Sequence, residues 1–153
     1  MANTRKEIVV AKEDAVFWLD KRGFWHSKEG KFQHRKIINY FHSSIRKDKD
    51  GYHIAQTYRD YKEKVYFPYE DTALFVFEVV KAEDIILVLN NKKRIKLKPK
   101  KLWIKDDNLY MYEGEDLIKF SEHALVRVAD LIEYENDQYF MRVRDRRYKI
   151  PQV

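Results

Sequence analysis

The chain has 153 residues, 44% of them hydrophobic and 37% charged, which excludes a membrane-embedded or disordered chain and predicts one domain or two small lobes. It contains no cysteine, so disulfide bridges, thiolate metal sites and cysteine nucleophiles are excluded. The formal net charge is +6, from 31 Lys and Arg against 25 Asp and Glu, and its meaning depends on where the excess lies.

The first part of the chain predicts a hairpin followed by a helix. Apolar and aromatic runs at 15–19 and 24–28 flank a turn that contains Gly23, a pattern typical of a β-hairpin. Apolar residues then recur at helical spacing between 37 and 45. A charged turn at 48–51 is expected to end this helix.

After residue 51 the pattern is mostly that of β-strands. Strands are expected at 52–58, 65–67, 73–80, 85–89, 94–97, 102–105, 109–112 and 139–143. The polar segments 90–91 and 106–108 are predicted to form tight turns between neighbouring strands. Ser121 is expected to cap a second helix, whose apolar residues recur between 124 and 132.

The order of these elements predicts an α+β fold with mostly antiparallel β-sheets, because strands joined by short hairpin turns do not form βαβ units. We expect two small β-rich lobes with about two helices, at 1–70 and 71–153, or one continuous domain with the same elements.

The apolar run at 8–11 is too short for a secretory signal, and no run reaches the roughly 18–20 apolar residues of a membrane span. The sequence therefore predicts a cytoplasmic protein.

A set of motifs between residues 23 and 79 is similar to a known pattern. The segments that carry it are Gly23-Phe24-Trp25-His26, Gly30, Arg35, Phe41, Ile45-Arg46-Lys47-Asp48, Asp50-Gly51-Tyr52, Thr57, Glu63-Lys64-Val65 and Glu70-Asp71-Thr72-Ala73. They resemble an uncharacterised bacterial family, the domain of unknown function numbered twelve eighty-five. This resemblance implies two small β-rich lobes, a role in ligand binding or signalling, and no enzymatic activity.

Five residues of the matching region form the first candidate site: Trp25, His26, Arg35, Glu70 and Asp71. We expect them to converge on a cleft between the lobes, where Trp25 stacks on a small polar or anionic ligand and Arg35 pairs with its charge. Glu70 or Asp71 would then orient Arg35. The alternative is structural, with Trp25 in the core and the two acids capping a turn or forming ion pairs.

A second candidate site is the basic stretch between Lys92 and Lys105, in which eight basic residues are uninterrupted by any acid. It is the basis of an alternative function, a nucleic-acid or polyanion-binding module whose aromatic side chains stack on single-stranded bases. The residues expected to carry this function are Lys96, Lys98, Lys100, Lys101 and Trp103. The structural alternative is a strand with Ile95 and Leu97 in the core and its lysines in water. Another basic excess lies at 142–149.

Metal binding and catalysis are not indicated. His34 and His42 are eight positions apart, whereas zinc ligands on one helix are typically three or four apart, so we predict no metal and no cofactor. Neighbouring acids such as Asp106 and Asp107 fall in expected turns, and no nucleophile elbow or phosphate-binding loop is present.

The sequence predicts a regulatory protein that binds a ligand or a protein partner without catalytic machinery. Its many aromatic residues leave a homodimer as an open alternative.

Overall fold

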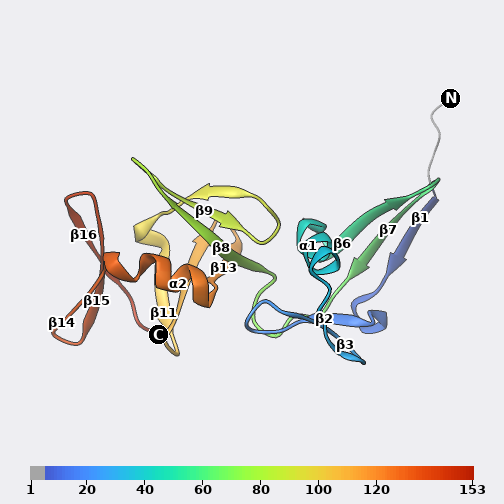
Figure 1. Ribbon diagram of the computed structural model, residues 1–153, viewed down its shortest axis with the longest axis horizontal. Coiled ribbons are helices and arrows are strands. Elements are labelled where there is room, and N and C mark those ends of the chain that lie inside the picture. The colour runs from blue at the N-terminus through green and yellow to red at the C-terminus, as the bar shows by residue number, and fades with distance from the viewer. Residues whose placement is uncertain (1–5) are drawn as a thin grey trace. The chain divides into compact units, whose positions relative to one another are not determined.

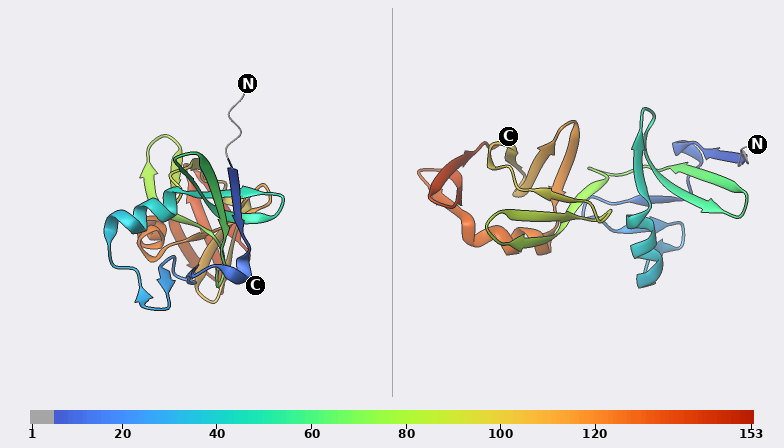
Figure 2. Two further views of the ribbon diagram at one scale, coloured as in Figure 1. Left: turned by 90° about the vertical axis from the view of Figure 1, so that its right-hand side faces the viewer. Right: turned by 90° about the horizontal axis from the view of Figure 1, so that it is seen from above.

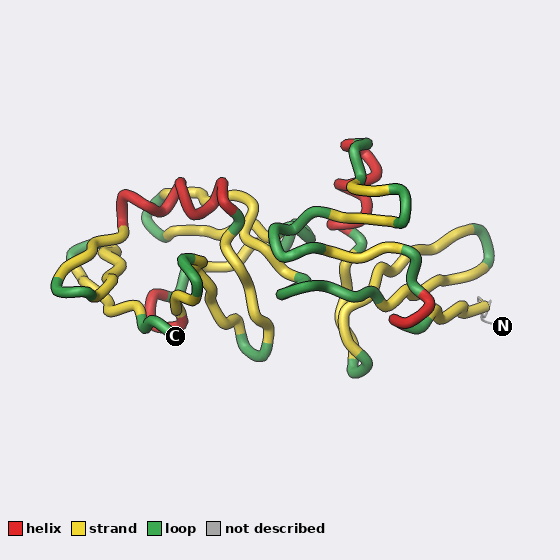
Figure 3. Tube along the Cα trace, turned by 90° about the horizontal axis from the view of Figure 1, so that it is seen from below, coloured by secondary structure: helices red, strands yellow, loops and turns green. Residues whose placement is uncertain are grey.

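The computed structural model describes residues 6–153, and the chain divides into two compact units, the first ending at Ala73 and the second spanning Leu74–Val153 (Figure 1). Residues 1–5, with which the predicted N-terminal lobe begins, lie outside the described residues. Strands and turns dominate both units, and the two α-helices are short (Figure 3). The predicted α+β class with mostly antiparallel sheets is confirmed.

The first unit contains two sheets and one α-helix. Its elements are β1 (Lys6–Val10), the 3₁₀ turn η1 (Lys12–Asp14), β2 (Phe17–Leu19), β3 (Trp25–Ser27), β4 (Gly30–Lys31), α1 (Arg35–Ser43), β5 (Ile45–Asp48), β6 (Gly51–Tyr58) and β7 (Tyr61–Tyr66). One sheet has the order β1-β7-β6-β5, in which only the β1–β7 pair is parallel among the described strands. The other is the small antiparallel sheet β2-β3-β4, which confirms the hairpin predicted around Gly23.

Helix α1 ends at Ser43, before the charged turn at 48–51 that the sequence predicts as its end. The pattern between 37 and 45 extended the helix to Ile45, but Ile45 begins β5 and pairs with Ile54 across a hairpin. The Ile45 side chain is 1% exposed and joins the core from the strand, so one apolar residue fitted both interpretations. The charged turn at 48–51 joins β5 to β6, where Gly51 has a φ of +117°, a conformation that glycine adopts without strain.

An aromatic cluster forms the core of the first unit. Trp25 is 1% exposed, and its ring has edge contacts with Phe67, Phe41 and Phe17 at centroid distances of 4.9, 5.4 and 5.8 Å. The indole N–H donates to His42 Nδ1 over 3.2 Å, which satisfies the polar atom of the ring inside the core. These contacts hold β3 against α1 and against the segment after β7.

The second unit contains a six-stranded sheet, a helix and a three-stranded sheet. Its elements are β8 (Leu74–Lys81), β9 (Ile85–Leu89), β10 (Arg94–Lys96), the 3₁₀ turn η2 (Pro99–Lys101), β11 (Leu102–Lys105), β12 (Asn108–Glu113), β13 (Asp116–Phe120), α2 (Glu122–Val128), the 3₁₀ turn η3 (Ala129–Leu131), β14 (Ile132–Glu135), β15 (Gln138–Val143) and β16 (Arg146–Ile150). The larger sheet has the order β10-β9-β8-β13-β12-β11, with β8 and β13 parallel at its centre.

Two turns and one helix cap that the sequence predicts in the second unit are confirmed. The turns expected at 90–91 and 106–108 join β9 to β10 and β11 to β12. Ser121 caps α2, because its hydroxyl oxygen accepts the N–H of Ala124 over 3.2 Å. Helix α2 lies against β8 (Figure 1).

The six-stranded sheet curls so that the chain after β10 returns to β12. The Lys98 N–H contacts the sulfur of Met111 at 3.4 Å, and the Lys98 ammonium forms an ion pair with Glu113. The next residues form η2 and lead into β11 at the far edge. Ile95 and Leu97 are 8% and 5% exposed, so the apolar positions of the basic stretch do face the core.

The tail forms a sheet where the sequence predicts a single strand at 139–143. β14, β15 and β16 pair in that order through two tight turns (Figure 1). They belong to the segment coloured orange-red to red in Figure 2. Asn136, Asp137 and Arg144 occupy the left-handed region in these turns, at φ of 52°, 62° and 57°. The flanking strands β14 and β16 are rich in charged residues, and their apolar signal is therefore weak.

Candidate functional sites

Trp25, the residue expected to stack on a ligand, lies in the core of the first unit. Its ring is enclosed by three phenylalanine rings and by His42. At 1% exposure it presents no ring face to a ligand in this structure. The structural alternative accounts for Trp25 without a ligand.

His26 and Glu70 lie at the turn between β2 and β3. His26 Nε2 is 2.7 Å from Asp20 Oδ2, and the imidazole stacks on Trp18 at a centroid distance of 5.5 Å. Glu70 Oε2 accepts the N–H of Lys21 over 2.8 Å. Glu70 therefore caps this turn through its carboxylate.

The same turn keeps the Asp20 carboxylate ionised. Partial burial raises its pKa, but hydrogen bonds from the Phe24 N–H, from His26 and from the Arg22 N–H outweigh burial and lower the pKa below its usual value. A carboxylate with so many donors is a weak proton acceptor near neutral pH. The Asp20–His26 pair is thus better suited to holding the turn than to acid–base catalysis.

Arg35 and Asp71 complete the predicted ligand site. Arg35 is the first residue of α1, is exposed, and forms no ion pair with any residue between 6 and 153. Asp71 is half-buried in the segment before β8. The structure brings His26 and Glu70 to one turn, and the ligand-binding role of the five residues stays a prediction.

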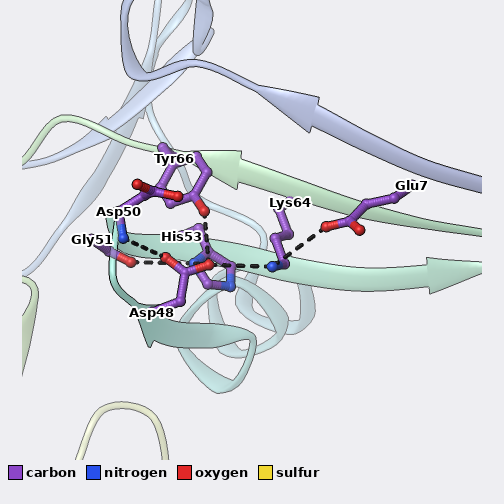
Figure 4. Close-up of polar contacts among 7 residues, drawn as sticks. All are labelled: Glu7, Asp48, Asp50, Gly51, His53, Lys64 and Tyr66. Carbon is purple, nitrogen blue, oxygen red and sulfur yellow. Dashed lines mark hydrogen bonds and ion pairs between the residues drawn. The ribbon is translucent and has the colours of Figure 1, made fainter.

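A polar cluster that sequence reasoning did not single out lies on the sheet β1-β7-β6-β5 (Figure 4). Asp48 Oδ2 accepts the Tyr66 hydroxyl over 2.8 Å and the Lys64 ammonium over 3.2 Å. Asp48 Oδ1 accepts the N–H of Asp50 over 2.9 Å. Lys64 also reaches Glu7 at 3.4 Å, so the cluster joins β5, β7 and β1.

These contacts shift three pKa values in the cluster. The Tyr66 hydrogen bond outweighs the effect of burial and, with the other donors, lowers the pKa of Asp48 to about 2. The same hydrogen bond raises the pKa of Tyr66, and the hydrogen bond to Asp48 raises the pKa of Lys64. His53 Nδ1 lies 3.9 Å from Asp48 Oδ2. Because Asp48 holds its proton so weakly, the cluster is not set up for general base catalysis.

The signal that points to this cluster was present in the sequence. Asp48, Asp50 and Lys64 all lie in the segments that carry the family resemblance. Tyr66 and Glu7 lie outside those segments, and only the pairing of β1 with β7 brings Glu7 near. Spacing along the chain gives no indication of that pairing.

The predicted polyanion residues fall into two groups. Lys96 pairs with Asp84 at 3.2 Å and Lys98 pairs with Glu113, so these two charges have partners. Lys100 and Lys101 in η2 are exposed and form no ion pair within the described part of the chain. A strand with its apolar residues in the core and its lysines at the surface therefore accounts for β10 and the residues just after it. It does not account for the two lysines of η2 that have no ion-pair partner among the described residues.

Trp103, the aromatic residue of the second candidate site, stacks on two tyrosines of β12. Its ring is 4.4 Å from Tyr110 with 12° between the planes, and 5.9 Å from Tyr112 with 25° between them. Tyr112 is 45% exposed. The buried Trp103 Nε1–H has no acceptor among residues 6–153. Such a group costs free energy, and its retention needs a reason.

The two basic stretches of the sequence come together in the second unit. Ile104 pairs in parallel with Gln152, and η2 lies against β16. Lys100 and Lys101 of η2 therefore come near the strand that carries Lys149. Lys100, Lys101, Lys105 and Lys149 are all exposed and form no ion pair within 6–153. We call these four lysines the basic surface.

Two findings concern other kinds of site. Among residues 6–153 no group of three or more His, Asp or Glu is placed to hold a metal ion. Neither helix in the described part of the chain has the length and apolar character that crossing a bilayer requires.

Two solved structures are similar to this chain. A DUF1285 family protein from Silicibacter pomeroyi DSS-3 superposes with a TM-score of 0.59 at 11% identity, over 95% of this chain and 82% of its own. The chain has the DUF1285 fold. A DUF1285 family protein from Shewanella baltica OS155 gives a TM-score of 0.51 at 17% identity, over 75% of this chain and 91% of its own.

The resemblance indicated by the motifs between 23 and 79 is thus confirmed at the level of the fold. The sequence matches no family model and no curated protein. At these identities the DUF1285 structures describe an architecture and carry no statement about ligand or activity.

Proposed function

We propose that the protein is a non-catalytic binding protein that holds an anionic polymer on the basic surface of its second unit. The observation that carries this proposal is the meeting of η2 and β16, which gathers lysines from both basic stretches. The surface ends at Asp106 and Asp107, the acidic turn after β11.

Within the described part of the chain, the lysines of the basic surface lack the counter-ions that several other lysines of the unit have. Lys81, Lys96 and Lys98 each have a carboxylate partner within 4 Å. The four lysines of the basic surface have none among the described residues. Like charges held close together repel, and a bound polyanion would relieve this repulsion while releasing its own counterions.

The small-ligand function predicted from the sequence has weaker support. Trp25 is enclosed in the core and Glu70 caps a turn, which leaves Arg35 as an exposed cation without an ion pair in the described part of that unit. A protein partner with an acidic surface is the alternative occupant of the basic surface, and it becomes the leading one if the oligonucleotide below does not bind.

The test uses the full chain and a labelled abasic oligonucleotide of about 20 sugar-phosphate units, a polyanion without bases. Fluorescence anisotropy is measured between about 50 and 200 mM salt. Four phosphate contacts predict a slope of about −3 in log affinity against log salt, from roughly 0.7 per contact on a single strand. The variant K100E/K101E/K149E should lose most of this binding and flatten the slope.

The matched control is K28E/K36E/K49E, which makes the same charge change at exposed lysines of the first unit that form no ion pair among residues 6–153. We expect the control to retain its affinity within about twofold. Equal loss in both variants would mean that only net charge matters. That result, or no binding by the unmodified chain, would overturn the proposal.

A further inference from the structure

We infer that the polymer bound by the basic surface is a single-stranded nucleic acid whose bases stack on Trp103 and Tyr112; this inference rests on the proposed function. Trp103 lies in β11, the strand that ends at Lys105 of the basic surface, and Tyr112 lies in the neighbouring strand β12. Trp103 and Lys105 are two positions apart in β11 and therefore share one face of the sheet. Trp103 and Tyr110 are register partners, and Tyr112 follows on the same face of β12.

The three rings form a stacking platform. Both tyrosine planes lie within 25° of the Trp103 plane. Tyr110 is 5% exposed and supports the platform from below the surface, whereas Tyr112 is 45% exposed. Aromatic side chains beside a line of cations are the usual means of holding single strands, because every base has a π-face and every nucleotide a phosphate.

The unpartnered indole N–H is a second, independent reason to assign a role to this ring. A phenylalanine at 103 would stack on Tyr110 and leave no buried donor without an acceptor. Packing alone therefore does not explain a tryptophan here. Its larger π-surface favours stacking on a ligand.

Duplexes and base-free polymers fit the platform less well. In a duplex the base faces are stacked on one another, and side chains on a sheet surface do not reach them. A base-free polyanion contacts the lysines alone. The predicted order of affinity is thus single strand first, with the duplex and the abasic strand weaker.

The experiment compares an oligothymidylate with the abasic strand of the same length, so that both carry the same phosphates. We expect the unmodified chain to prefer the oligothymidylate by about tenfold, the effect of stacking one base. Trp103→Leu should abolish this preference and leave the affinity for the abasic strand unchanged. Trp103→Phe, which keeps a ring, should restore part of it.

Unchanged binding of the abasic strand shows that the Trp103→Leu variant is folded and that its lysines are in place. Tyr112→Leu should lower the preference as well, whereas Tyr58→Leu, at a 53% exposed tyrosine of the first unit, should not. Equal affinity for both strands, or for a duplex and the oligothymidylate, would overturn this inference and leave the proposed function standing. Failure of both strands to bind would overturn the proposed function itself.

Discussion

At the scale of single residues, Asp48 joins three strands through one carboxylate. It lies in β5 and accepts hydrogen bonds from Tyr66 and Lys64 in β7, and Lys64 in turn reaches Glu7 in β1. Each of these contacts favours the ionised carboxylate. Part of the stability of the sheet therefore depends on Asp48 remaining charged.

The pH dependence follows from the sign of this shift. The pKa of Asp48 is about 2 in the folded protein against a usual 3.8, so its stabilisation is complete above about pH 4 and is lost as the pH falls towards 2. We expect Asp48→Asn to remove this part of the acid sensitivity in urea unfolding. Tyr66→Phe should move the loss to higher pH, because the hydroxyl that lowers the pKa of Asp48 most is gone.

Asp50→Asn is the control for this series, since Asp50 contributes its backbone N–H to the cluster. Its profile between about pH 2 and 6 should follow that of the unmodified chain. If Asp48→Asn kept the full acid sensitivity, the stabilising role of Asp48 would be wrong.

At the scale of elements, the short helix α2 depends on its cap. It has seven residues, too few for an isolated helix to be stable, and its first turn is held by the Ser121 hydroxyl. Ala124 and Val128 are fully buried, so the cap also fixes two core side chains.

We expect Ser121→Ala to lower the free energy of unfolding by about 1 kcal/mol, measured by chemical denaturation. Ser121→Asn keeps a capping side chain and should stay close to the unmodified chain. Equal destabilisation by both substitutions would indicate that the hydroxyl is needed for packing rather than for the helix end.

The elements that the sequence predicted correctly are those with a local signal. The turns at 90–91 and 106–108 and the cap at Ser121 are decided by a few neighbouring residues. Helix α1 was predicted too long because Ile45 continues the helical spacing, whereas in the structure Ile45 begins β5 and pairs with Ile54. The outer strands of the tail sheet carry mostly charged residues and give little signal.

The candidate sites were predictable to a smaller extent. A buried Trp25 and a ligand-stacking Trp25 look the same in a sequence, because burial depends on rings from α1 and from the segment after β7. The approach of η2 to β16 goes with the pairing of Ile104 with Gln152. Long-range pairings of this kind leave no trace in spacing.

At the scale of the whole molecule, each of the two units has a core of its own. The first packs around Trp25 and Phe67, and the second around residues such as Leu109, Met111 and Ile118, all at most 1% exposed. Local stability can therefore differ between them.

Trp25→Ala tests this organisation. A tryptophan removed from a core costs about 3–5 kcal/mol, a large part of the stability of a small unit. We expect amide hydrogen exchange to accelerate strongly in strands of residues 6–73 and much less in strands of 74–153. Equal acceleration in both halves would mean that the chain unfolds as one cooperative body.

The parallel pair at the centre of the six-stranded sheet has a consequence for folding kinetics. Leu74 in β8 pairs with Ile118 in β13, 44 positions along the chain, whereas the hairpins β9–β10 and β11–β12 close over a few residues. Closing the longer loop costs more chain entropy before any contact repays it. We therefore expect the hairpins to form early and the β8–β13 pairing to come late. During synthesis, β8 must wait with one side unpaired until β13 has emerged, which is the interval in which this strand is most exposed to aggregation.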